Sequence, residues 1–171
     1  MDHEEEEENQ FQLAFGEHAN ISQQCRDKVN AIRNNDADAT IFNSLNYHDI
    51  EILSDMGWEL IGRYIANNTH LETITFVNSG ITDSKMIPLF RGLTKSCSIK
   101  QLDLSENEFG IEGTRSMVSF LSNSPNLSKL DLTGNGNIST EGFELLINAL
   151  NRGAIEELQL RRCNIANISA L

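Results

Sequence analysis

The sequence predicts an α/β solenoid, a chain wound into similar coils that stack on one another. A block of apolar residues that begins at Leu71 returns at Ile99, Leu127 and Ile155, so its starting position advances by 28 each time. The first half of each block fits a short strand, and the second half shows apolar residues at helical spacing. Self-similarity at a fixed period indicates a repeat architecture, in which each coil buries its apolar side chains against its neighbours.

The first half of each repeat is predicted to be a strand followed by a turn. It reads Leu-Glu-Thr-Ile-Thr-Phe from position 71, Ile-Lys-Gln-Leu-Asp-Leu from 99, Leu-Ser-Lys-Leu-Asp-Leu from 127 and Ile-Glu-Glu-Leu-Gln-Leu from 155. The first, fourth and sixth residues are expected to point inward, so that one strand per coil builds a parallel sheet. The ninth residue lies at the bend, where a buried polar side chain can satisfy backbone groups. It is Ser79, Asn107, Asn135 or Cys163, and Cys163 is therefore interpreted as structural rather than as a reactive thiol.

The second half of the repeats is predicted to be helical. Apolar residues recur three and four positions apart. Polar residues suited to a helix N-cap precede two of the runs, at 82–84 and 139–141. The runs are Met86, Leu89, Phe90 and Leu93; Met117, Phe120 and Leu121; and Leu145, Leu146, Ala149 and Leu150.

The blocks share the pattern Leu-x-x-Leu-x-Leu-x-x-Asn/Cys-x-Leu, which over residues 71–165 resembles the leucine-rich repeat of the ribonuclease-inhibitor type. The resemblance implies a leucine-rich-repeat solenoid, a horseshoe segment with a parallel concave sheet and convex helices. The helical pattern at 57–68 is similar to that of one more repeat, whose degenerate strand is expected within 39–53. The motif is specific for the fold and says little about function.

Three parts are expected along the chain. Residues 1–19 start with a run of acidic residues and are interpreted as an acidic disordered tail, with an arm for a basic partner as the alternative. Residues 20–36 show one apolar helical face and are interpreted as an N-terminal capping helix, with a partner-binding helix as the alternative. The leucine-rich-repeat domain is expected at 37–171, with a degenerate first repeat at 39–70, repeats at 71–98, 99–126 and 127–154, and a partial repeat at 155–171.

The composition excludes several classes of partner. A net charge of −12 argues against nucleic acid, which needs clustered Lys and Arg, and against an anionic membrane surface. No apolar stretch approaches the length of a membrane-spanning helix, and the acidic N-terminus does not resemble a signal peptide. The three cysteines are widely spaced, which favours a reducing compartment. We expect the cytoplasm, with the nucleus as the alternative.

No motif typical of catalysis stands in the sequence. The phosphate-binding loop and the zinc-protease motif are absent. Asp36-Ala-Asp38 lacks the Gly and Glu of a calcium loop, and the four histidines have no metal-like spacing with the cysteines. We therefore expect no enzyme, no cofactor and no metal.

Residues that alternate with the buried ones are predicted to form a partner-binding concave face. Asp103 and Asp131 occupy equivalent positions, so their carboxylates should lie side by side; either a basic partner compensates them or they stay solvated. With basic residues at its far end, the face is mixed in charge, which predicts a wet interface governed by charge complementarity. The predicted set is Thr73, Thr75, Gln101, Asp103, Glu106, Lys129, Asp131, Glu157, Gln159, Arg161 and Arg162.

The predicted function is a protein-binding scaffold that uses the concave face. One alternative is a regulator of a small GTPase of the Ran type, because Leu102-Asp-Leu-Ser-Glu-Asn107 resembles the repeats of proteins that activate such GTPases. Another is a structural module of a longer protein. The sequence stops at Leu171, before the helix that the register places after Ile165. A fragment of a longer solenoid is therefore expected, or an end covered by a partner or by self-association.

Overall fold

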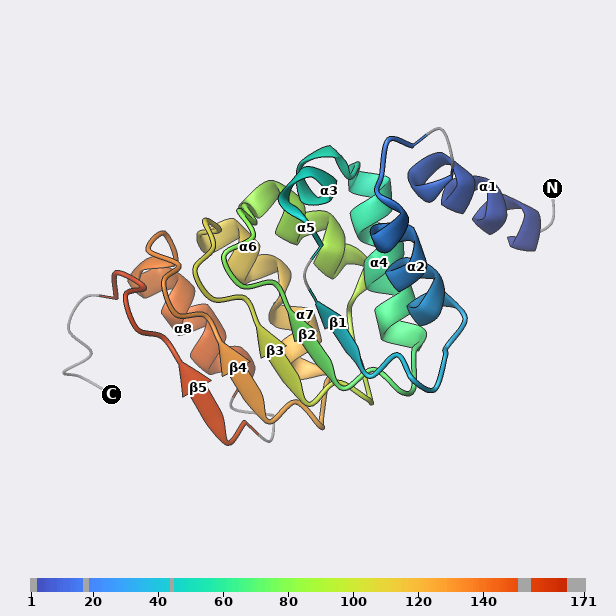
Figure 1. Cartoon of the computed structure of the whole chain (residues 1–171). Coiled ribbons are helices and arrows are strands. Elements are labelled where there is room, and N and C mark those ends of the chain that lie inside the picture. Colours follow the sequence, from blue (N-terminus) through green and yellow to red (C-terminus); the bar gives the residue numbers. More distant parts are fainter. Residues whose placement is uncertain (1–2, 17–18, 44, 151–154, 166–171) are drawn as a thin grey trace.

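Figure 1 shows the computed structural model of the chain, which describes residues 3–16, 19–43, 45–150 and 155–165. The strands lie side by side in one sheet, and the helices of the coils cover one of its faces (Figure 1). The sheet order is β1-β2-β3-β4-β5, and every neighbouring pair is parallel. The strands are β1 (Ile41–Asn43), β2 (Thr73–Thr75), β3 (Gln101–Asp103), β4 (Lys129–Asp131) and β5 (Glu157–Gln159). The predicted α/β solenoid with a parallel sheet is thereby confirmed.

Helices follow the strands in chain order. Two N-terminal helices, α1 (His3–Phe15) and α2 (Gln23–Arg33), precede the first strand. Helices of successive coils pack against each other, α4 on α5, α5 on α6, and α8 on both α6 and α7. The helices within the coils are α3 (Tyr47–Ile52), α4 (Asp55–Asn67), α5 (Asp83–Gly92), α6 (Ile111–Ser116), α7 (Val118–Ser122) and α8 (Ser139–Leu150).

The repeat sets the register of the sheet. Thr73 lies opposite Gln101, Gln101 opposite Lys129 and Lys129 opposite Glu157, so the partners are always one full repeat apart along the chain. The central residues of β2, β3 and β4 are buried against the helices. β1 pairs Ile41 with Thr73, which is a longer step than in the later coils, and it lies within the stretch expected to hold a degenerate strand.

Asn107 joins two coils at the bend after the strand. Its Oδ1 accepts hydrogen bonds from the N–H groups of Ser79 and Ile81, both at 3.0 Å. Its Nδ2 donates to the carbonyls of Phe76, at 2.6 Å, and Leu104, at 2.9 Å. Ser79, Ile81 and Phe76 belong to the preceding coil, so one buried side chain satisfies backbone groups of two coils at once.

The same position is filled by Asn135 and Cys163 in the following coils. Asn135 donates to the carbonyls of Leu104 and Leu132, at 2.9 and 2.8 Å. The Cys163 thiol is buried and donates to the Leu132 carbonyl at 3.1 Å. Burial raises the pKa of the Cys163 thiol, so the reactive thiolate is disfavoured. These contacts support a structural role for Cys163.

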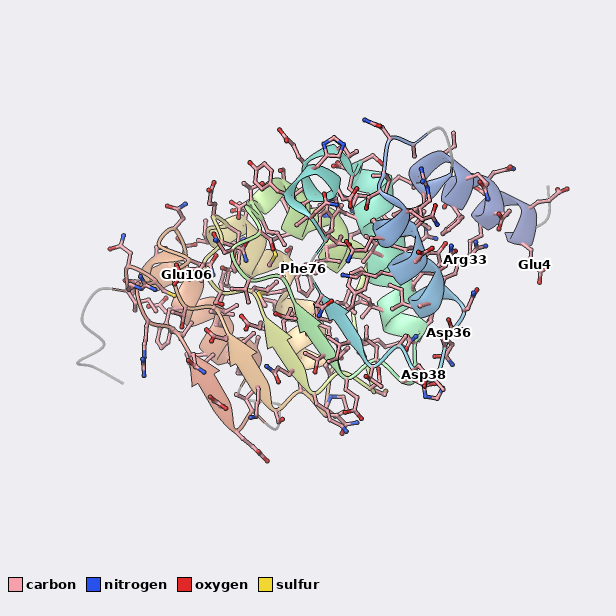
Figure 2. All side chains as sticks on the ribbon, viewed as in Figure 1. Glu4, Arg33, Asp36, Asp38, Phe76 and Glu106 are labelled. Carbon is pink, nitrogen blue, oxygen red and sulfur yellow. The ribbon has the colours of Figure 1, made fainter. Side chains whose placement is uncertain are left out.

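The N-terminal residues form a helix, so the expectation of a disordered tail is wrong for the described part of 1–19. α1 buries Phe11, Ala14 and Phe15, which share one face because they are three and four positions apart, and it packs on α4. Arg33 of α2 lies between α1 and α2 (Figure 2). Its guanidinium pairs with Glu8 at 2.6 Å and lies 4.2 Å from the centre of the Phe11 ring. The acidic run therefore forms the exposed first part of a helix whose apolar face is anchored on α4.

α2 lies where the amphipathic helix is expected and packs on α4, with Cys25, Val29 and Ile32 buried. Its capping role stays a prediction. The N-terminus of α2 is bonded to α3 through Asp49. This buried carboxylate accepts hydrogen bonds from the Ser22 N–H at 2.7 Å and from the Ser22 hydroxyl at 2.5 Å. Asp36 and Asp38, the pair considered for calcium, lie exposed in the loop after α2 (Figure 2).

Candidate protein-binding face

The sheet face that points away from the helices is built from the alternate residues of the strands. The side chains of these alternate residues are partly or fully exposed. Leu102 and Leu130, which lie between them along the strands, are each 1 % exposed. Short strands held in a common register place the side chains in rows, which makes the face rigid. We call this surface the concave face; it carries Thr73 and Thr75 of β2, Gln101 and Asp103 of β3, Lys129 and Asp131 of β4, and Glu157 and Gln159 of β5.

Asp103 and Asp131 are paired across adjacent strands, as the repeat predicts. Each also closes the turn that follows its strand. Asp103 Oδ1 accepts from the Ser105 N–H at 3.0 Å, and Asp131 Oδ1 accepts from the Thr133 N–H at 2.8 Å. These hydrogen bonds give each aspartate a structural role in its own turn, and they hold both carboxylates in one orientation. The second oxygen of each carboxylate has no hydrogen bond within the described residues.

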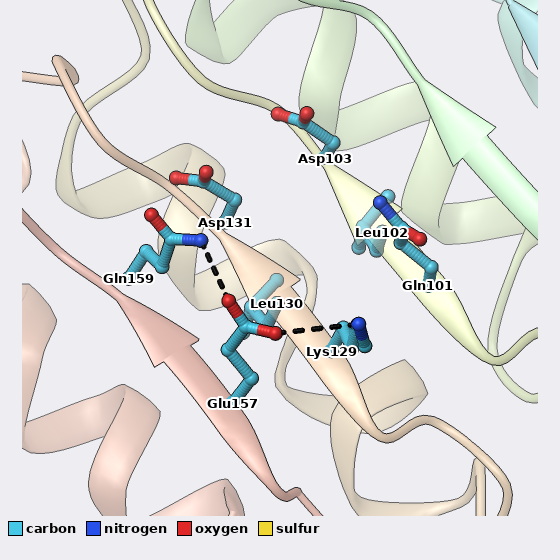
Figure 3. Close-up of a pocket in the computed structure, with 8 residues that line it drawn as sticks. All are labelled: Gln101, Leu102, Asp103, Lys129, Leu130, Asp131, Glu157 and Gln159. Atoms are coloured by element: carbon cyan, nitrogen blue, oxygen red, sulfur yellow. Dashed lines mark hydrogen bonds and ion pairs between the residues drawn. The ribbon is translucent and has the colours of Figure 1, made fainter.

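A shallow hollow of about 200 Å³ lies over β3, β4 and β5. Figure 3 shows the polar side chains around it, with Leu102 and Leu130 at its floor. The Glu157 carboxylate makes two contacts in the hollow. It lies 3.4 Å from Lys129 Nζ, and it accepts a hydrogen bond from Gln159 Nε2 at 2.9 Å. The hollow therefore has a charge-compensated end at Lys129 and Glu157 and an acidic end at Asp103 and Asp131.

The rim beyond the strands is bridged by Glu106 and Arg162, whose side chains form an ion pair. Gly134 lies between them in the stack of coils and makes this pair possible. A Cβ on Gly134 would meet the Glu106 carboxyl carbon at 2.6 Å, and the backbone of Gly134 has φ +81°, which favours glycine. Arg161 is exposed and makes no ion pair within the described part of the chain.

The structure thus gathers most of the predicted residues around one hollow and places the others at its borders. Glu106, Arg161 and Arg162 stand on the rim, and Thr73 and Thr75 lie on β2, outside the hollow. Two exposed apolar residues of the first coil were missed: Ile41, 56 % exposed and level with Thr73, and Tyr47, 67 % exposed. The longer step between β1 and β2 hides Ile41 from a search at the period of the later repeats.

Other kinds of site find little support in the described residues. Within ranges 3–16, 19–43, 45–150 and 155–165, no three or more His, Cys, Asp or Glu residues are grouped to hold a metal ion. None of the helices in the same ranges has the length and apolarity needed to cross a membrane.

Comparison with known proteins agrees with the fold. A family model described as Leucine Rich repeat matches residues 95–117 and 123–146. A structure titled leiomodin-1 actin-binding site 2 superposes with a TM-score of 0.68 at 15% identity, over 82% of this chain and 81% of that one. The C-terminal domain of tropomodulin from Caenorhabditis elegans superposes with a TM-score of 0.63 at 17% identity, over 83% of each chain. Together with the periodic sequence, the buried asparagines and the parallel sheet, these similarities show that the chain has a leucine-rich-repeat fold.

Proposed function

We propose that the chain is a protein-binding module and that its partner docks on the concave face. The observation that carries the proposal is the pair of oriented carboxylates, Asp103 and Asp131, each with one oxygen available beside the hollow. Rigid strands hold them, so a partner would meet a preorganised surface at low entropic cost. A basic side chain of the partner that reaches both carboxylates would relieve their mutual repulsion.

The mixed charge of the face defines the chemistry of the partner. The acidic end of the hollow favours a Lys or Arg, while Arg161 on the rim, which has no ion pair within the described residues, favours an acidic group. Such an interface is wet and polar, and complementarity sets its specificity and association rate more than its area does.

Actin is the first partner to test, because one structure with a similar fold is titled as an actin-binding site. Co-sedimentation with actin filaments and titration of fluorescent monomeric actin would measure binding. We expect the double variant Asp103→Lys/Asp131→Lys to weaken binding to its partner at least about 30-fold, since truncated or reversed charge pairs cost roughly 2 kcal/mol or more.

The matched control is Glu141→Lys/Glu144→Lys, which changes the charge equally on the exposed surface of α8. Affinity capture with the unchanged chain, the concave-face variant and this control would extend the test beyond actin. Partners that are lost only with the concave-face variant support the proposal. Equal capture by all three chains would reject the concave face as the binding surface.

The regulation of a Ran-type GTPase remains a separate prediction. A hydrolysis assay of purified GTPases with and without the chain tests it, and unchanged hydrolysis across the panel would reject it.

A further inference from the structure

Two large apolar side chains stand exposed on the rim at the N-terminal half of the sheet. Tyr47, at the start of α3, is 67 % exposed, and Val77, in the turn after β2, is 47 % exposed. In the next two coils, the position of Val77 is occupied by the polar residues Ser105 and Thr133. Apolar residues scattered singly over a surface need no explanation, whereas grouped ones indicate a binding surface. The meaning of these two therefore depends on whether they lie together.

The surroundings of Gly80 place both side chains on one rim. Gly80 lies just after the turn that Val77 begins, and a Cβ on Gly80 would meet the Tyr47 ring at 2.9 Å. The ring of the first coil therefore lies on the turn of the second coil. Both residues follow their strands, β1 and β2, so they stand at the carboxyl ends of the strands, where α3 also lies (Figure 1). We call Tyr47 and Val77 the apolar rim.

A network of hydrogen bonds holds the backbone beside Tyr47 in place. The preceding residue, Asn46, caps α3: its side chain accepts from the Asp49 N–H at 2.9 Å and donates to the Asp49 carboxylate at 2.6 Å. The buried Asp49 is also bonded to Ser22 at the start of α2. A tyrosine on a rigid support offers a partner a large contact area at little entropic cost, and tyrosine is enriched among the residues that dominate binding energy.

The strand residues beside the apolar rim are uncharged. On the outward side of β1 and β2 stand Ile41 and Asn43, which are paired with Thr73 and Thr75. Lys28 of α2 lies at the outer border of this region, where its ammonium donates to the Asn43 carbonyl at 2.5 Å and to the Asn43 side-chain oxygen at 3.2 Å. The outward side of the sheet thus has an uncharged half on β1 and β2 and a charged half on β3 to β5.

The acidic end of the hollow continues the apolar rim along the carboxyl ends of the strands. In the sheet, β3 with Asp103 follows β2, and β4 with Asp131 follows β3. Figure 3 shows the two carboxylates on these neighbouring strands. Each keeps one oxygen without a hydrogen bond within the described residues, so a cation could reach both without displacing a partner. Charge complementarity therefore selects a basic group for this end, and the net charge of −12 acts in the same sense.

We propose that the concave face binds a helical segment of a partner protein. The segment carries an apolar side chain that contacts Tyr47 and Val77, and a Lys or Arg that reaches Asp103 and Asp131. This inference rests on the proposed function of the concave face and adds the chemistry and the spacing of the bound segment. The apolar rim supplies contact area, and the carboxylates decide which apolar segments are accepted.

The register of the sheet sets the distance between the two contacts. The apolar rim lies at β1 and β2 and the aspartates lie at β3 and β4, so their centres are two strand spacings apart. With strands about 4.8 Å apart and the rim about two residues further along, this distance is about 10–12 Å. A helix places side chains about seven residues apart on one face, about 10.5 Å from each other. An extended segment offers about 7 or 13 Å on one face and fits less well.

Selection from a peptide library tests the proposal with the 171-residue chain. The probe is a phage-displayed library of helical peptides of about 20 residues, long enough to hold a helix, with random residues on one face. Selection on the immobilised chain should enrich peptides with an apolar or aromatic residue and a Lys or Arg about seven positions apart. Fluorescein-labelled synthetic copies of the enriched peptides are then titrated with each variant by fluorescence polarisation.

The apolar-rim variant, Tyr47→Ser/Val77→Ser, should raise the dissociation constant of these peptides at least about 10-fold, because it removes both apolar contacts. Ser105 already occupies the position of Val77 in the next coil, so serine suits the fold there. The matched control, Leu13→Ser/Ile87→Ser, removes two apolar side chains that are exposed on α1 and α5. It should bind like the unchanged chain, and circular dichroism verifies that each variant is folded.

The concave-face variant, Asp103→Lys/Asp131→Lys, separates this inference from the proposed function. It should weaken binding of the peptides as the apolar-rim variant does, whereas Glu141→Lys/Glu144→Lys, with the same change of charge on α8, should not. If the concave-face variant alone loses the peptides, the concave face remains the binding surface and the inference is overturned. If neither variant loses them, both the inference and the proposed function are rejected.

Ile41→Thr tests the path of the segment, because Ile41 lies at the amino end of β1, away from the apolar rim. Loss of binding with Ile41→Thr but not with the apolar-rim variant would place the segment elsewhere on the sheet and overturn the inference. Enriched peptides that lack a basic residue, or a selection that enriches no peptide, would equally overturn it.

Discussion

Replacement of Asn107 by alanine should be far more costly than the same replacement of Asn135, although both are buried at the same position of the repeat. Asn107 Oδ1 accepts the Ser79 and Ile81 N–H groups. The Asn135 Oδ1 has no partner within the described structure. Both side chains donate to carbonyls of two coils, so the accepted bonds are the main difference between them.

The magnitude follows from the groups left behind. Asn107→Ala strands two buried N–H groups at about 1–3 kcal/mol each, for about 2–6 kcal/mol in addition to the lost donations. Asn135→Ala loses only donations, at about 1–2 kcal/mol. Unfolding in urea, followed by far-UV circular dichroism, should therefore separate the variants by about 2 kcal/mol or more. For a chain of this length, the midpoint temperatures should differ by about 4–8 °C.

Asn148→Ala on the exposed surface of α8 serves as the control and should change stability by no more than about 0.5 kcal/mol. Equal losses for Asn107→Ala and Asn135→Ala would refute the assignment of the stabilising energy to the accepted bonds.

Further predictions concern three other parts of the fold. Asp49→Ala should lower the unfolding free energy by about 2–4 kcal/mol and speed hydrogen exchange in α2, because it strands the Ser22 donors in a buried site; unchanged exchange in α2 would contradict this. Gly62→Ala should cost at least about 2 kcal/mol, since its Cβ would meet the Leu89 carbonyl oxygen at 2.1 Å, whereas Gly136→Ala, with 3.9 Å to the nearest atom, is the control for the same urea measurement. Burial raises the pKa of the Cys25 thiol to about 12, so a thiol reagent should label exposed Cys97 in the native chain and Cys25 only after unfolding. The same shift predicts that stability falls as pH rises from about 9 towards 12, because the unfolded thiol loses its proton first, and constant stability over that range would count against it.

Much of the repeat region could be predicted because its determinants are local and periodic. Ile74, Leu102 and Leu130 recur at one spacing, so a single register identifies the buried row, the exposed row and the pairing of Asp103 with Asp131. Asn107 and Cys163 could be assigned to the bend for the same reason. The residues of the concave face could be predicted because they alternate with the buried residues along each strand. Their role in binding stays a prediction.

The first coil and the N-terminus could not be derived in this way. Phe11 and Phe15 anchor α1 on α4, a helix distant along the chain, and the acidic run before them dominates the composition. The exposed position of Ile41 on β1 could not be predicted, because the spacing between β1 and β2 departs from the 28-residue repeat. In both places the deciding contacts join segments whose spacing occurs only once in the sequence.

The sequence by itself therefore determined the solenoid, its register and the polar row along its sheet, because in a repeat protein each coil contacts mainly its neighbours and the period carries that information. Only the tertiary structure decided which charges find partners. Glu106 reaches Arg162 over Gly134, Glu157 reaches Lys129, and the carboxylates of Asp103 and Asp131 remain available. Side-chain pairing depends on distances in space between coils, and those distances are fixed only when the coils have packed.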